Sequence, residues 1–294
     1  MIEKFLEHWQ LFGYSYYEGW LIGLLLSLIG VIVVARDQIF IGAAVSQASA
    51  LGIALALCIA SMLPTHADHP ATQTHTDSWI HSDTFQATMA VAFSIAAALV
   101  TARGGRVRRE SHEAITGWVF LGSASLSVLI LSHSPHGLEE IHRIHSSSLL
   151  GAAPMEVAVF ALLTAVSIAV LMVVHRRLLL FALDPSMAAA VGMKVNRWSI
   201  VFAIWLGLAV GLSIRASGML YTFGTLVLPA LIAKNICREV RPMFLVAPAV
   251  ALGASSFAFV LANYFDFPNA QMTVAVLAVL LVLAWSTRPN SFHS

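Results

Sequence analysis

Nine apolar runs, each close to the ~20 residues that a helix needs to cross a membrane, constrain this chain most strongly. In lipid the backbone must satisfy its own hydrogen bonds, and an apolar run does so by forming a helix. We therefore predict an all-α polytopic membrane protein with eight to nine transmembrane helices in one domain, residues 1–294. The runs are Gly19–Ala35, Ile39–Leu63, Thr84–Ala102, Ala114–Ser132, Pro154–Val174, Trp198–Ile214, Ser217–Ala233, Met243–Ala262 and Gln271–Ser286.

The seventh run is the weakest, because Pro229 interrupts it and Gly218 and Gly224 lie within it. Backbone groups freed by proline or glycine must be satisfied by neighbouring protein. We expect this segment inside the bundle as a short or broken helix, which would leave eight full spans. Gly207 and Gly211, four apart in the sixth run, form a pattern typical of close helix packing in lipid.

The low charge content excludes several classes of protein. Only 11% of the residues are charged, against about 25% in a soluble domain, which excludes a soluble enzyme, a disordered chain and a nucleic-acid-binding protein. The chain also has no Walker A phosphate loop. If ATP drives this protein, we expect a separate chain to hydrolyse it.

The distribution of basic residues predicts an orientation. Only Lys4, Arg143 and Arg215 of the 16 Lys and Arg residues lie on one side; the rest lie on the other, which is therefore cytoplasmic. We expect a multi-pass membrane protein, in contact with lipid, with its N-terminus outside. An outer aromatic belt fits Tyr14, Tyr16, Tyr17 and Trp20.

Eight of the 12 histidines fall in two predicted outer loops, residues 64–83 and 133–153. Imidazole and carboxylate groups suit zinc and other first-row divalent ions. This composition favours a low-affinity metal-capturing surface over solvated loop histidines. Its candidate residues are His66, His69, His75, His81, His133, His136, Glu140, His142 and His145.

The long cytoplasmic loop, residues 175–197, contains a short helix signature. Asp184 followed by Pro185 is typical of a helix start, and Gly192 of a helix end. Basic residues flank the segment on both sides. The pattern predicts a short amphipathic helix on the inner surface, which by itself would suit any interfacial helix.

Three segments, taken in order, resemble the zinc- and manganese-type permeases of ABC importers. LDPSMAAAVGM (183–193) resembles the coupling helix of ABC importer permeases. SIRASGMLYTFGTLVLPALIAKN (213–235) and ARDQIFIGAAVSQASALGIALA (35–56) resemble two runs of the metal-importer family. The resemblance implies a permease bundle like that of the vitamin B12 importer, with a cytoplasmic coupling helix. The implied contacts with the ATPase are Asp184, Pro185, Ala188, Ala189 and Gly192.

The same resemblance implies a place in the bacterial cytoplasmic (inner) membrane, together with partners and cargo. It implies a separate ATPase subunit that holds the ATP, an extracytoplasmic metal-binding protein, and a second permease copy or a sister permease. It implies no permanently bound cofactor. The cargo would be a divalent metal, with zinc favoured and manganese or iron as the other candidates.

One departure from the family concerns the second span. The family places an Asp just after a Gly and a His four residues later, where this chain has Ala43 and Gln47. A partner permease could supply the ligands, or the cargo could pass hydrated or chelated. The candidate pathway residues are Gln47, Ser46, Ser49 and Pro229.

Two other classes compete with this interpretation. A secondary-active metal-ion transporter would need ionisable groups inside the membrane, and the runs contain almost none beyond Glu156. A membrane enzyme with histidine boxes could use His133 with His136 and His142 with His145. That family's boxes face the cytoplasm, whereas these face outside by the charge rule.

Overall fold

The computed structural model describes residues 2–62, 83–107, 111–132 and 152–286. The described chain is helical, and eight of its helices are long and apolar enough to cross a membrane. The elements are α1 (Ile2–Ala35), α2 (Phe40–Met62), α4 (Asp83–Val107), α5 (His112–Ser132), α7 (Pro154–Leu183), α8 (Pro185–Ala190), α9 (Val195–Ile236), α10 (Val240–Phe265) and α11 (Asn269–Ser286).

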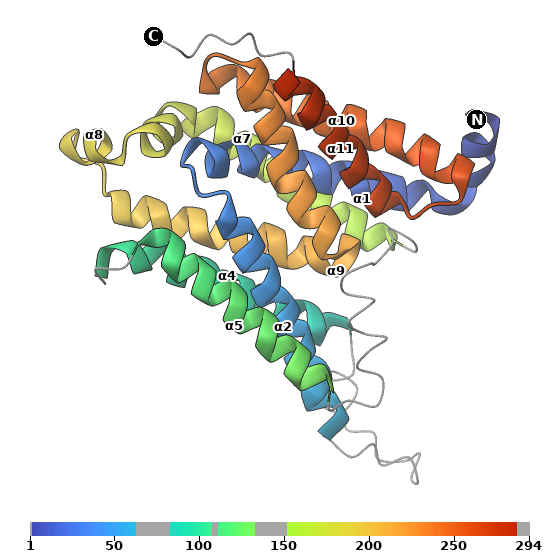
Figure 1. Ribbon diagram of the computed structural model, residues 1–294, viewed down its shortest axis with the longest axis horizontal. Coiled ribbons are helices and arrows are strands. Elements are labelled where there is room, and N and C mark those ends of the chain that lie inside the picture. The colour runs from blue at the N-terminus through green and yellow to red at the C-terminus, as the bar shows by residue number, and fades with distance from the viewer. Residues whose placement is uncertain (1, 63–82, 108–110, 133–151, 287–294) are drawn as a thin grey trace.

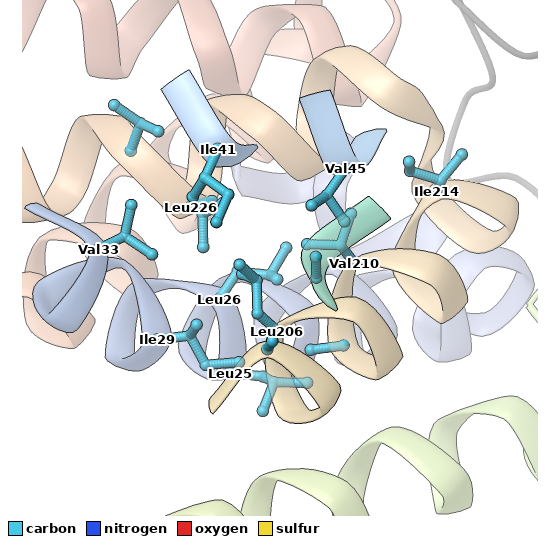
Figure 2. Close-up of a cluster of buried hydrophobic side chains, with 14 of the residues drawn as sticks. Leu25, Leu26, Ile29, Val33, Ile41, Val45, Leu206, Val210, Ile214 and Leu226 are labelled. Carbon is cyan, nitrogen blue, oxygen red and sulfur yellow. The ribbon is translucent and has the colours of Figure 1, made fainter. Parts of the chain in front are cut away.

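The centre of the bundle is formed by α1, α2 and α9. In Figure 1, α4 and α5 lie on one side of these helices and α10 and α11 on the other. The apolar span of α1 is 78% buried, whereas that of α7 is only 22% buried. Figure 2 shows the core where α1, α2 and α9 meet, with Leu26, Val45 and Leu206 among its side chains. A peripheral helix such as α7 thus exposes most of its apolar surface.

The first helix begins earlier than its apolar run predicts. α1 includes Trp9 and Tyr16, whose rings lie 5.6 Å apart. Tyr16 is fully buried against Phe259 of α10, and its hydroxyl accepts a hydrogen bond of 2.7 Å from Asn263 Nδ2. The prediction that Tyr16 belongs to a lipid-facing aromatic belt is therefore wrong, although Tyr14 and Tyr17 are exposed.

The first half of α9 runs antiparallel to α7. Trp205 Nε1 donates a hydrogen bond of 2.9 Å to Ser167 Oγ. Seven residues earlier in α9, the ring of Trp198 lies 6.4 Å from that of Phe181, which is farther along α7. The later contact on α7 is thus the earlier one on α9, so the two segments run in opposite directions.

Contacts with α1 fix the other two directions. α7 is parallel to α1, because Thr164 Oγ1 bonds the Leu21 carbonyl at 3.4 Å and Arg36 lies over the Phe181 ring farther along both helices. The second half of α9 is also parallel to α1. It pairs the Tyr221 hydroxyl with the Gly19 carbonyl at 2.8 Å, and later the Leu226 backbone lies against Gly30. The two halves of α9 therefore run in opposite directions.

The reversal in α9 occurs at Gly218. This residue has φ 79° and ψ 167°, a region that essentially only glycine occupies. Each half has the length of one span, so the eight apolar helices of the described chain contain nine span-length segments, which match the nine predicted runs. Of the two forms expected for the seventh run, the short helix is the one found, because the chain turns at Gly218 and Pro229 lies within the helical second half without breaking it. That half is largely buried, as expected of a segment inside the bundle.

The glycine pair of the sixth run forms the predicted close contact. A Cβ at Gly207 would lie 2.6 Å from the Ile95 Cα of α4, and one at Gly211 would lie 2.7 Å from the Val91 Cα. Ser94 Oγ of α4 also donates a hydrogen bond of 2.5 Å to the Gly207 carbonyl. Small residues here let the two backbones approach, which is how helices associate in lipid.

We expect Gly207→Ala to destabilise the protein by about 1–3 kcal/mol, the usual cost of overpacking a close contact. Gly253→Ala is the matched control, because no atom lies within 4 Å of a Cβ placed at Gly253 in α10. Thermal unfolding in detergent measures both variants. Equal melting temperatures for the two would contradict the α4–α9 contact.

Candidate coupling helix and membrane pathway

The short helix α8 begins at a cap formed by Asp184. Asp184 Oδ1 accepts hydrogen bonds from the backbone N–H of Ser186 at 3.0 Å and of Met187 at 2.9 Å, and from Ser186 Oγ at 2.5 Å. Pro185 occupies the first helical position, as predicted. The Ser186 hydroxyl, followed by the Met187 and Ser186 backbone, holds the pKa of the Asp184 carboxyl below its ordinary value.

The other end of α8 is closed by Gly192. The Gly192 N–H bonds the Ala189 carbonyl and the Met193 N–H bonds the Ala188 carbonyl, both at 3.0 Å. With Gly192 at φ 85°, this is a Schellman cap, whose left-handed residue is usually glycine. Both ends of the helix are thus fixed locally. The non-helical connection, residues 184–194 apart from α8, is shorter than predicted because α7 continues to Leu183.

Two of the three alanines of α8, Ala188 and Ala189, differ in exposure. Ala188 is fully buried and packs against the chain itself. Ala189 is exposed, and so are Met187 and Val191, at 57% and 67%. A partner that docks on α8 would therefore meet Ala189 and the two apolar side chains, whereas Ala188 has no surface to offer.

We expect Asp184→Ala to disorder α8, because the alanine side chain accepts no hydrogen bond, whereas Asp184→Asn keeps a good cap. Hydrogen exchange at Met187 and Ala188 would report the difference between the two variants. In the wild type the lowered carboxyl pKa means that the cap persists above the ordinary pKa and is lost as pH falls through the lowered one. Identical exchange in both variants would contradict the cap.

The candidate pathway residues of α2 lie inside this chain. Ser46 and Ser49 are fully buried, and Gln47 and Ala43 are 7% and 6% exposed. The hydroxyl oxygens of Ser46 and Ser49 are buried without a hydrogen-bond partner. Helices α4, α5 and α9 cover α2, and Pro229 is buried in the half of α9 that contacts it. The structure thus places the four candidates on adjoining helices, and their role in a pathway stays a prediction.

The predicted metal-capturing histidines, together with Glu140, lie outside the described residues. Within the described ranges, no group of three or more His, Cys, Asp or Glu side chains comes close enough to hold a metal ion. The capture surface stays a prediction.

One charged cluster was not predicted from the sequence. Glu18 is 2% exposed in α1, and it interacts electrostatically with Glu156 of α7 and Arg215 of α9. Arg215 Nη1 lies 3.5 Å from Glu156 Oε1, while Glu18 Oε1 is buried without a hydrogen-bond partner. The sequence placed Glu18 before its first run, and the earlier start of α1 is what buries it.

Comparison with known proteins identifies the family. The family model of the ABC 3 transport family matches residues 11–288. The chain belongs to this family. Its members are permeases of metal-type ABC transporters, so the chain is not itself an enzyme. This membership removes the secondary transporter and the histidine-box enzyme as alternatives.

Two solved structures share the fold. PsaBC from Streptococcus pneumoniae in complex with Fab matches with a TM-score of 0.77 at 17% identity, over 98% of this chain and 97% of its own. An inward-facing metal-chelate type ABC transporter matches with a TM-score of 0.71 at 17% identity, over 96% of this chain and 89% of its own. No curated protein matches the chain. The predicted permease bundle is therefore confirmed.

Proposed function

We propose that this permease forms the translocation pathway of an importer for divalent metal ions, with zinc as the favoured cargo. A separate ATPase subunit, which holds the ATP, docks on α8. The observation that carries the proposal is the rigid presentation of α8, which is capped at both ends and exposes Ala189, Met187 and Val191. A helix that is capped at both ends can pass a movement of the docked subunit to the membrane helices, whereas a frayed loop would absorb that movement.

The proposed orientation is that of a bacterial inner-membrane protein with its N-terminus outside. Exposed basic residues lie near the helix ends that the order of the helices puts on the side of α8, among them Arg176 near the end of α7, Lys194 just before α9 and Arg238 between α9 and α10. Cytoplasmic loops carry such an excess of Lys and Arg. The ATPase, which needs cytoplasmic ATP, would therefore meet α8 on the correct side.

The proposed assembly contains two permeases, either two copies of this chain or this chain with a sister permease. An extracytoplasmic metal-binding protein delivers the cargo to the opposite face. The support is the family itself and its PsaBC neighbour, the name of which covers two components.

The proposed cargo rests on three observations. The histidine-rich segments suit zinc, since imidazole and carboxylate groups are its usual ligands. The family's pore Asp and His are Ala43 and Gln47 here, so α2 offers no strong ligand. One structural neighbour is of the metal-chelate type. Transport of zinc in hydrated or chelated form fits all three observations.

Reconstitution tests this proposal. The permease is copurified with its ATPase and placed in proteoliposomes with the binding protein, and uptake of radioactive zinc, manganese and iron is measured. We expect ATP-dependent uptake with zinc fastest. Copurification without ATP-dependent uptake of any of the three metals, free or chelated, would overturn the function, and manganese in first place would overturn only the metal.

The outer histidines should matter only when metal is scarce. Replacing His66, His69, His75 and His81 by alanine removes neutral imidazoles that bind metal above their usual pKa, about 6.5. We expect a several-fold higher half-saturation concentration at pH 7.5, no change in the maximal rate, and convergence with wild type below pH about 5.5. Superimposed uptake curves at every pH would assign these residues to solvated loops.

A further inference from the structure

An apolar groove opens between α7 and α10, on a side of the bundle that the coupling helix and α2 do not use. α7 and α10 both pack against α1 but make little contact with each other. The groove has a volume of about 610 Å³. Leu24 and Leu28 of α1 form its floor, and Leu171 of α7 and Phe244 of α10 stand on its walls.

The length of the groove matches one membrane leaflet. Its α7 wall extends from Ile168 to Leu179, a rise of about 16 Å at 1.5 Å per residue. Half of the hydrocarbon core is about 15 Å thick. The groove therefore reaches from the level of the headgroups to about the middle of the membrane, which is the depth that one acyl chain occupies.

The groove has a cationic mouth. Arg241, near the start of α10, lines it, and the exposed Arg176 and Arg177 lie on α7 between His175 and Leu179, which also line it. Arg241 is exposed, and no carboxylate among the described residues pairs with it or lines the groove. His175 also lines the groove, where its Nδ1 contacts the Met172 carbonyl at 3.1 Å. The polar end thus offers an unpaired guanidinium, which binds phosphate oxygens well.

We propose that this groove binds an anionic phospholipid of the leaflet on the α8 side. One acyl chain lies on Leu24 and Leu28, and the phosphate sits at Arg241. Charge complementarity favours this occupant over a second copy of the permease. In a symmetric dimer through this face, the Arg241, Arg176 and Arg177 groups of both copies would meet at one level, and like charges repel.

Lipid titration of the full-length chain tests the proposal and needs no transport, so it is independent of the proposed function. Native mass spectrometry measures binding of phosphatidylglycerol and of phosphatidylcholine with the same chains. We expect Arg241→Gln to weaken phosphatidylglycerol binding about fivefold, the contribution of one basic residue near an anionic membrane surface. Arg238→Gln is the matched control, because Arg238 is exposed nearby but does not line the groove; it should bind as wild type does.

A second pair of variants tests the acyl-chain part. Met172→Trp fills the groove from an exposed position that lines it, whereas Val173→Trp adds the same ring to the next residue, which is 84% exposed and does not line it. We expect only Met172→Trp to reduce the number of retained lipids. Full competition by glycerophosphoglycerol, which has no acyl chains, would overturn the lipid assignment. Equal effects within either pair, or loss of the bound lipid when two permeases associate, would also overturn it.

Discussion

Ala189→Arg is expected to abolish ATP-driven metal uptake while the permease stays folded and in the membrane. Ala189 is exposed on α8, so arginine at this position causes no clash within the chain. In the proposed complex the side chain would enter the ATPase cleft without a partner. An unpaired buried charge costs about 3–5 kcal/mol, which corresponds to a more than 100-fold weaker contact.

Ala189→Ser is the control for this prediction, because serine keeps the residue small and uncharged. It should support nearly normal uptake. Copurification of the ATPase, uptake into proteoliposomes and thermal unfolding of the permease are measured for both variants. Normal uptake by Ala189→Arg at normal expression would exclude α8 as the coupling helix, whereas loss of folding in detergent would show that Ala189 packs within the chain.

Restoring the family's two ligands in α2 should create a metal trap. Ala43→Asp and Gln47→His lie one helical turn apart on one face, so both side chains can reach the same ion. Ala43 is 6% exposed, and an unpaired carboxylate there should destabilise the apo-permease by about 3–5 kcal/mol. Zinc at 100 times its Kd would return about 2.7 kcal/mol. We expect a zinc-dependent melting temperature, retained metal and slower uptake, because conduction requires weak binding.

A second double variant on the same helix serves as the control. Ala44→Asp with Ala48→His has the same spacing and is also buried, at 0% and 4% exposure, but lies on a different face of α2. Elemental analysis measures the zinc that each double variant retains, and thermal unfolding measures how its melting temperature depends on zinc. Equal zinc retention in both would show that the face with Ala43 and Gln47 is not special and does not line the route.

Signals that act over a few residues made much of this protein predictable. Apolar runs located the helices, because every crossing must hide its backbone from lipid. The caps of α8 were readable as Asp184, Pro185 and Gly192, because a cap is made by side chains and dihedral angles within one turn. The Gly207 and Gly211 contact was predictable for a similar reason, since only small residues permit it.

The sequence could not say which face of each helix is buried. In a soluble protein apolar residues mark the inner face, but in lipid the outer face is equally apolar, so the pattern carries little information about facing. Ala188 and Ala189 look alike in the sequence, yet packing buries only the first. The partnerless hydroxyls of Ser46 and Ser49 are likewise visible only in the packed bundle.

Long-range packing also decided where charge and space lie. Glu18 became a buried group beside Glu156 and Arg215 because α1, α7 and α9 converge there, although these residues are far apart in the chain. The groove between α7 and α10 exists because both helices pack on α1 without closing on each other. The sequence therefore determined the apolar spans, α8 and its caps, whereas the reversal at Gly218, the burial of charge and the groove depended on contacts between distant segments, which no local pattern encodes.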